Sequence, residues 1–158
     1  MNTLDNKIIE LKDLDSDRIS FIGSKVVFTN GCFDLLHPGH LHYLEEAKML
    51  GDLLVVGLNS DDSVSRLKGE NRPINNQNFR SRMLAGLMFV DYVIIFEEDT
   101  PLTLIKGIEP NVLVKGGDYA REEIVGFHET IMTGGIVEII PFLEGFSSTD
   151  LIEKIQNL

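Results

Sequence analysis

The feature that most constrains the fold is a junction at residues 25–51, where an apolar run passes through a tight turn into a helical pattern. Lys25–Thr29 is short and β-branched, and Asn30-Gly31 bounds it, which predicts a buried strand that ends at a turn. Pro38 has the fixed φ of a first helical position, and apolar residues then recur at helical spacing as far as Gly51. The sequence therefore predicts a helix that begins directly after the first strand.

Two histidines at this predicted helix start are candidates for phosphate binding. Unpaired N–H groups and the positive end of the helix dipole make such a terminus an anion site. His37 and His40 are three residues apart and project to neighbouring positions around the first turn, and Gly39 adds no side chain between them. A lone histidine is more often a satisfied polar residue, but the combination with the strand and the glycine turn favours a site for a transferring phosphate. A zinc site is disfavoured, because Cys32 is the single cysteine.

Four further apolar runs, at residues 53–59, 91–96, 112–115 and 136–140, predict more strands. Helical patterns separate them at 77–89, from Pro101 onward with Thr100 as the cap, and at 121–133, and a last helix follows Asp150. This alternation predicts one α/β domain, a Rossmann-like, five-stranded parallel sheet with helices on both faces, at residues 25–158. Residues 1–24 are expected to form an N-terminal arm or short helix. In the 77–89 helix the buried side is expected to carry Phe79, Met83, Leu84, Leu87 and Met88.

Composition excludes several classes of protein. The chain is 43% hydrophobic and 25% charged, as in globular proteins, and it contains no apolar run near the roughly 18 residues of a membrane span. Its net charge of -11 argues against nucleic-acid binding. The polar N-terminus does not resemble a signal peptide, and a single cysteine favours a reducing compartment, so a cytoplasmic location is expected.

Positive charge gathers in one stretch of this acidic chain. Arg66, Lys68, Arg72, Arg80 and Arg82 are separated by only one acid, Glu70. The stretch is either a solvated surface or, as we prefer, part of a pocket for a small, multiply charged anion.

Loops at the carboxyl ends of the predicted strands should meet in one cleft, because ligands of such sheets collect where the winding reverses. These loops span residues 30–40, 59–72, 115–119 and 142–149. No dinucleotide fingerprint or P-loop follows any strand, so neither explains phosphate binding here.

Motifs at residues 30–40 and 145–149 resemble those of a known enzyme superfamily. Asn30-Gly-Cys-Phe-Asp34 with His37-Pro-Gly-His40 resembles the signature of the nucleotidyltransferases that act on phosphorylated small molecules. Gly145-Phe-Ser-Ser-Thr149 is similar to the motif with which that superfamily holds the β and γ phosphates, although it could also be a helix N-cap, and both roles can coexist. Cytidylyltransferases for glycerol 3-phosphate have an arginine where this chain has Phe142 or Leu143, which disfavours CTP.

Within the superfamily, residues 59–73, 96–101 and 114–119 are similar to the adenylyltransferase half of the bifunctional lipopolysaccharide heptose enzymes. The resemblance implies transfer of AMP from ATP to D-glycero-β-D-manno-heptose 1-phosphate, with ADP-heptose and pyrophosphate as products. The sugar-kinase half is expected to be absent, because the segment before Lys25 is too short for it. The alternatives are a glycerol-3-phosphate cytidylyltransferase, an FAD synthetase of the same superfamily, or a non-catalytic nucleotide-binding scaffold.

The resemblance also implies roles for individual residues. His37, His40 and Lys68 would be catalytic, Mg²⁺ would arrive with the ATP phosphates rather than in a protein metal site, and the protein would be a homodimer. Asp34 is expected to cap a helix or pair with a nearby base. The expected nucleotide-binding residues are Asn30, Gly31, Cys32, Phe33, His37, Gly39, His40, Gly116, Asp118, Gly145, Phe146, Ser147, Ser148 and Thr149. The expected substrate-binding residues are Arg66, Lys68, Arg80 and Lys115.

Overall fold

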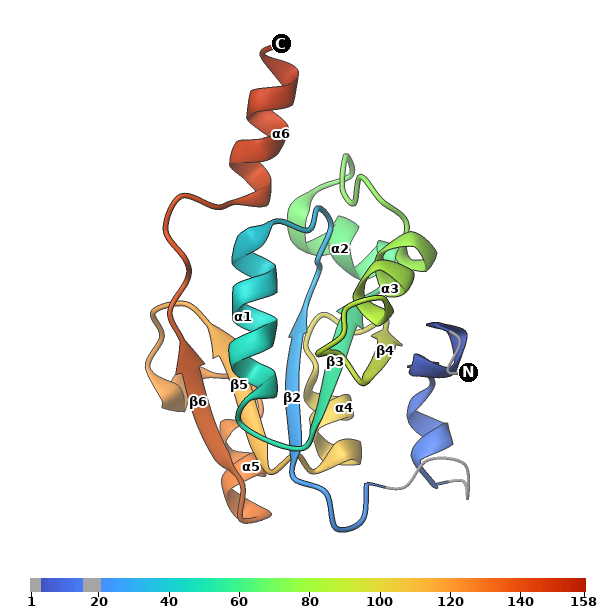
Figure 1. Cartoon of the computed structure of the whole chain (residues 1–158), viewed down its shortest axis with the longest axis vertical. Coiled ribbons are helices and arrows are strands. Elements are labelled where there is room, and N and C mark those ends of the chain that lie inside the picture. Colours follow the sequence, from blue (N-terminus) through green and yellow to red (C-terminus); the bar gives the residue numbers. More distant parts are fainter. Residues whose placement is uncertain (1–3, 16–20) are drawn as a thin grey trace.

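A parallel sheet with strand order β1-β4-β3-β2-β5-β6 organises the computed structural model, which describes residues 4–15 and 21–158 (Figure 1). The strands are β1 (Ile8–Ile9), β2 (Val26–Gly31), β3 (Leu53–Asn59), β4 (Tyr92–Phe96), β5 (Val112–Gly116) and β6 (Ile136–Ile140). The winding reverses between β2 and β5, which are neighbours in the sheet although the chain visits β3 and β4 between them. The α/β class and the parallel sheet predicted from the sequence are confirmed.

The sheet has six strands where the sequence predicted five. The sixth, β1, comes from the segment expected to be an arm or short helix, and it pairs with β4 through Ile8 opposite Val93 and Ile9 opposite Ile94. Two 3₁₀ turns flank it, η1 (Leu4–Lys7) and η2 (Leu11–Asp15). A two-residue strand is too short to produce an apolar run, so the pattern of the sequence could not reveal it.

Helices cover both faces of the sheet. On one face α1 (Pro38–Lys48) and α3 (Gln77–Ala85) bury residues such as Leu44 and Leu84 against Val56. On the other face α4 (Leu102–Ile108) buries Leu104 against Val55, and α5 (Phe127–Met132) packs beside it. Because both faces are covered, the strands are largely apolar rather than alternating between apolar and polar residues.

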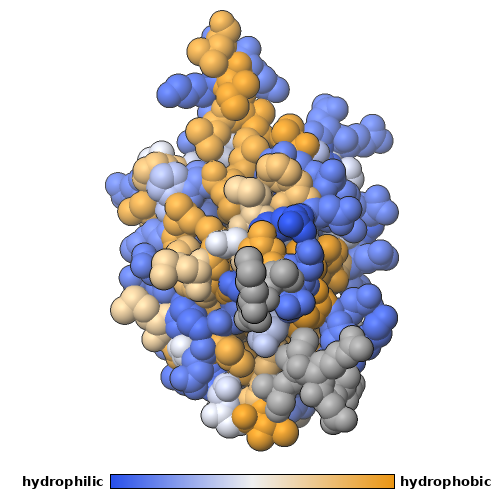
Figure 2. Space-filling view, turned by 45° about the vertical axis from the view of Figure 1, so that its right-hand side comes forward, coloured by the Kyte–Doolittle hydropathy of each residue, from blue (hydrophilic) through white to orange (hydrophobic). Residues whose placement is uncertain are grey.

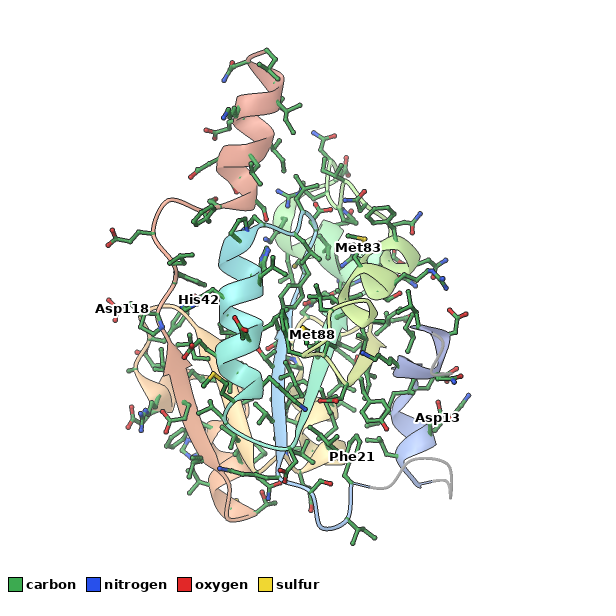
Figure 3. All side chains as sticks on the ribbon, in the orientation of Figure 1. Asp13, Phe21, His42, Met83, Met88 and Asp118 are labelled. Carbon is green, nitrogen blue, oxygen red and sulfur yellow. The ribbon has the colours of Figure 1, made fainter. Side chains whose placement is uncertain are left out.

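The predicted helix at 77–89 ends earlier and buries different residues. α3 stops at Ala85, and the side chains of Phe79, Met83 and Met88 are 51%, 46% and 91% exposed. Met83 and Met88 are labelled in Figure 3. Leu84 is fully buried, as expected, and Leu87 is half-buried. The inner face of α3 instead contains Arg80, because backbone carbonyl oxygens accept hydrogen bonds from its buried guanidinium. Hydrophobic periodicity cannot anticipate a buried charge.

Two other helices also have boundaries that differ from those predicted from the sequence. α4 begins at Leu102 with Pro101 at its N-cap, one residue later than predicted, and the cap position makes no side-chain hydrogen bond. The predicted helix at 121–133 is divided into η3 (Arg121–Glu123) and α5, because Gly126 adopts a φ of +90° between them. α2 (Asp61–Lys68) begins after Ser60, whose hydroxyl accepts from the Ser63 N–H at 3.2 Å.

α6 (Ser148–Gln156) projects from the end of the molecule toward which the carboxyl ends of the strands point (Figure 1). Its apolar side chains are gathered on a surface that is open to solvent (Figure 2). Leu151 and Ile155 are 36% and 62% exposed. None of the helices in the described ranges is long and apolar enough to cross a membrane.

Candidate active site

A cleft of about 810 Å³ lies at the carboxyl ends of β2, β3 and β5, where the winding of the sheet reverses. Its walls come from the loop after β2, the end of α2, the loop after β5 and the segment that leads into α6. These are the four loops whose convergence the sequence predicted. Their meeting follows from topology, because the carboxyl ends of parallel strands share one edge of the sheet.

Most of the residues expected at the site line this cleft. They are Asn30, Gly31, Cys32, Phe33, His37, Gly39, His40, Lys68, Lys115, Gly116, Phe146, Ser147, Ser148 and Thr149. Four expected residues are not part of the lining: Arg66, Arg80, Asp118 and Gly145. The side chain of Asp118 is exposed near the end of β5 (Figure 3).

The two histidines stack on each other at the start of α1. Their ring centroids are 3.8 Å apart and the ring planes make an angle of 24°. Phe33, which has a φ of +46°, packs against His40 at 5.2 Å between ring centroids. A Cβ at Gly39 would lie 3.0 Å from Cε1 and Nδ1 of His37 and 3.1 Å from Cβ of Phe146, so only glycine fits here without a shift of its neighbours. The close stack therefore depends on the residue between the histidines.

Each of the two histidines has a ring nitrogen that no described residue satisfies. The Nδ1 atoms of His37 and His40 are buried and have no hydrogen-bond partner among the described residues. Burial, the His37 imidazole and the Lys68 ammonium, in that order of importance, lower the pKa of His40 to about 4. Burial also lowers the pKa of His37. Both imidazoles are therefore neutral at pH 7 in the free protein. Buried polar atoms without partners are rare, so this pair is a candidate for binding a ligand.

The first turn of α6 is tied to the histidine loop. Ser147 caps the helix, with its hydroxyl accepting from the N–H groups of Thr149 at 3.2 Å and Asp150 at 3.4 Å. The Ser148 hydroxyl donates to the carbonyl oxygen of Leu35 at 3.1 Å. The cap alternative from the sequence is thus correct. A second helix N-terminus faces the cleft that contains the histidines, and its phosphate role stays a prediction.

Asp34 pairs with a basic residue, Arg72, which is one of the two alternatives expected from the sequence. Its buried carboxylate accepts from Nε of Arg72 at 2.7 Å and from the N–H groups of Ile74 and Asn75 at 2.9 Å each. Burial alone would raise the pKa of this carboxyl, but these three donors together hold it below its usual range. Asp34 therefore fastens the loop at residues 69–76 beside the histidine loop.

Arg80 and Arg66 direct their guanidinium groups at protein oxygens. Arg80, 1% exposed, donates to the carbonyl oxygens of Cys32 at 2.7 Å and Asn59 at 2.8 Å and pairs with Asp61 at 2.7 Å. Arg66 pairs with Asp99 at 2.8 Å. These contacts give Arg80 a structural function, the joining of the ends of β2 and β3, and they hold both guanidiniums away from the lining.

Residues outside the predicted set also line the cleft, among them Tyr43 and Arg72. The Tyr43 hydroxyl lies 2.5 Å from Oγ1 of Thr29 and donates to the carbonyl oxygen of Val114 at 3.3 Å, so it links β2 to β5. Tyr43 follows His40 by three positions, one turn along α1, and this spacing is the signal that could have identified it. Lys115 lies in the same wall, where burial lowers its pKa.

Comparisons with known proteins identify the family of this chain. A family model described as cytidylyltransferase-like matches residues 28–154. The bifunctional protein HldE of Haemophilus ducreyi is 60% identical over 134 residues, which are 85% of this chain, and the chain spans 28% of that relative's length.

Two solved structures share the fold. The lipopolysaccharide core biosynthesis protein of Thermoplasma volcanium is 32% identical, with a TM-score of 0.63 over 77% of this chain and 98% of its own. Pantothenate synthetase of Thermus thermophilus, at 17% identity, has a TM-score of 0.62 over 92% of this chain and 67% of its own, which is a likeness of fold alone.

Proposed function

Because the chain belongs to the cytidylyltransferase-like family, we propose that it transfers AMP from ATP to D-glycero-β-D-manno-heptose 1-phosphate. The observation that carries the proposal is the stacked pair His37 and His40, whose buried, unpaired Nδ1 atoms lie in a cleft that also contains the start of α6. Two relatives support the choice of acceptor: HldE of Haemophilus ducreyi and the lipopolysaccharide core biosynthesis protein of Thermoplasma volcanium. The products would be ADP-heptose, a precursor of the lipopolysaccharide core, and pyrophosphate.

The reaction needs no covalent enzyme intermediate. An oxygen of the acceptor phosphate attacks the α phosphorus of ATP and forms a P–O bond. The bond from that phosphorus to the bridging oxygen breaks, and pyrophosphate leaves with the electron pair. The acceptor oxygen is already anionic, so no base has to remove a proton from it. Catalysis then consists of holding the two phosphates in line and neutralising the charge that spreads over the transferring group.

The cleft supplies that neutralisation from several sides. His37 and His40 offer ring nitrogens to the α phosphate and the bridging oxygen, and polyphosphate beside them favours their protonated forms. Lys68, the last residue of α2, and Lys115, in β5, line the cleft and add positive charge. The N–H groups at the start of α6 suit the β and γ phosphates. Fixed donors of this kind are effective because they need no rearrangement during the reaction.

Mg²⁺ is proposed to enter with ATP and to supply charge neutralisation on the β and γ phosphates. Within the described ranges no three His, Cys, Asp or Glu side chains are grouped so that they could hold an ion. Asp34 lines the cleft, but its two carboxylate oxygens already accept from Arg72, Ile74 and Asn75. The donor set therefore fits an ion that is held mainly by the nucleotide.

We further propose that the protein acts in the cytoplasm as a homodimer. The exposed apolar residues of α6 and of the segment before it, including Phe142 and Ile155, are a surface that a second copy could cover. Binding of nucleic acid is not expected at a net charge of -11.

The test is pyrophosphate release with ATP and, separately, CTP against heptose 1-phosphate, glycerol 3-phosphate and FMN. Turnover with ATP and heptose 1-phosphate alone is expected, whereas activity with CTP or FMN would indicate another transferase activity of the same superfamily.

His37→Ala and His40→Ala should each lower kcat about 10²- to 10³-fold with the fold retained, by analogy with the loss of a transition-state donor. His42→Ala is the matched control, because His42 is exposed on the same helix (Figure 3). Near-normal rates in both histidine variants would refute the assignment.

A further inference from the structure

Arg72 has a guanidinium that the protein satisfies only in part. Its Nε donates to the Asp34 carboxylate at 2.7 Å, and the side chain is 14% exposed. Its Nη2 is buried and has no hydrogen-bond partner in the described part of the chain. Arg72 also lines the cleft with the two histidines. A cationic donor is therefore left over at the wall of the proposed active site.

The position of this donor is fixed by its surroundings. The backbone of Arg72 is tied to α2, because its carbonyl oxygen accepts from the Ser65 hydroxyl at 2.7 Å. Asn75 secures the far side of the loop, with its side-chain amide donating to the backbone oxygen of Asp34 at 2.8 Å. Asp34 is itself 1% exposed at its side chain. The guanidinium thus has little freedom to turn away, and its orientation is set before any ligand binds.

A buried charged donor without a hydrogen-bond partner destabilises the folded protein, because it has lost its hydration without compensation. An anion bound in the cleft would accept that hydrogen bond and offset the lost hydration. Arg72 is well placed for a phosphate, because Asp34 is only three residues before His37 and Lys68 acts electrostatically on His40. A guanidinium that is held by a carboxylate on one side and free on the other suits a phosphate oxygen, for which arginine is a strong ligand. The other arginines near the cleft are less suitable, because Arg66 and Arg80 pair with Asp99 and Asp61.

We propose that Arg72 binds a phosphate oxygen of a substrate in the cleft and that Asp34 is the positioning residue that aims it. This inference rests on the proposed function, since it takes phosphates to be the ligands of the cleft. The phosphate could belong to the nucleotide or to the acceptor. Asp34 touches no substrate in this arrangement and acts only through Arg72 and the 69–76 loop.

Direct binding separates this inference from the identity of the acceptor. The affinity of the protein for ATP and for pyrophosphate is measured by titration calorimetry without turnover, and KM for each substrate is measured separately. Arg72→Ala is expected to weaken one ligand about 10- to 100-fold, as for a charge-assisted hydrogen bond. A loss for ATP and pyrophosphate assigns the nucleotide phosphates, whereas a rise in KM for heptose 1-phosphate alone assigns the acceptor.

Two further variants test the positioning role. Arg72→Lys retains the charge but cannot keep the side contact with Asp34 and reach a ligand together, so it should recover only part of the affinity. Asp34→Asn turns an amide N–H toward the N–H groups of Ile74 or Asn75, so it should weaken the same ligand as Arg72→Ala does. In the double variant the two losses should not add, because they share one mechanism.

Arg82→Ala is the matched control. Arg82 belongs to the same basic stretch, but it is exposed, pairs with Asp5 and is not part of the cleft lining. It removes the same charge and should leave both affinities and KM values unchanged. Wild-type affinities in Arg72→Ala, with only a lower Tm, would show a structural role and overturn the inference. If the wild type binds ATP in an Arg72-dependent way but turns over no heptose phosphate, the proposed acceptor fails and the inference stands.

Discussion

Partial burial of His40 makes the stability of this protein sensitive to acid. The pKa of His40 is about 4 in the folded protein, against 6.5 as the ordinary value that applies to the unfolded chain. Protons therefore prefer the unfolded chain. As far as His40 is concerned, the free energy of unfolding should be greatest above about pH 6.5 and should decrease as the pH is lowered through 6.5. It should stop decreasing below about pH 4.

The size of the effect follows from these two values. Near pH 5.5 an unfolded histidine is mostly protonated and folded His40 is mostly neutral, which corresponds to roughly 1.4 kcal/mol in favour of unfolding. Near pH 7.5 the same term is about 0.1 kcal/mol. Since His40 retains some contact with solvent, we expect its contribution to the free energy of unfolding to fall by about 1 kcal/mol between these pH values.

Urea unfolding of the wild type and of His40→Asn at the two pH values measures this term. Asparagine is neutral throughout, and the other titrating groups are the same in both chains, so the difference between the two chains isolates His40. The wild type should lose about 1 kcal/mol more than His40→Asn on acidification. His42→Asn, an exposed control on the same helix, should follow the wild type. Equal losses in the wild type and His40→Asn would refute the reasoning that burial keeps His40 neutral.

Two further substitutions test the packing around the site. Gly39→Ala places a Cβ 3.0 Å from the His37 ring, so we expect kcat to fall about tenfold or more with little change in Tm, measured by pyrophosphate release and thermal melting. Tyr43→Phe removes the hydroxyl that meets Thr29 and the Val114 carbonyl, so the free energy of unfolding should fall by about 1–2 kcal/mol in urea titrations, and an unchanged midpoint would contradict that contribution.

The local patterns of the sequence were enough to predict the α/β class and the place of the site. A buried run followed by Asn30-Gly31 and Pro38 marks a strand, a turn and a helix start within a few residues, so the position of the histidines at the start of α1 needs no distant information. Alternation of strands and helices implies a parallel sheet, and a parallel sheet gathers its carboxyl-end loops at one edge. The cleft was predictable for that reason.

Elements whose existence depends on distant partners were not predictable. Ile8 and Ile9 are a strand only because β4 offers them an edge more than eighty residues away. Met83 was expected to be buried and is exposed, because the inner face of α3 contains Arg80 instead. Met88 was also expected to be buried, but it lies beyond the end of α3 at Ala85 and is exposed.

The arginines show most clearly which properties depend on the tertiary structure rather than on the local sequence. Arg66, Arg72 and Arg80 carry the same charge in one basic stretch, and by itself the sequence determined only that positive charge gathers near a phosphate site. The fold places the carbonyl of Cys32, forty-eight residues from Arg80, against one guanidinium, and it leaves Nη2 of Arg72 unpaired beside the histidines. Which cation is enclosed and which faces a ligand depends on where oxygens from other strands lie, and only the tertiary structure decides that.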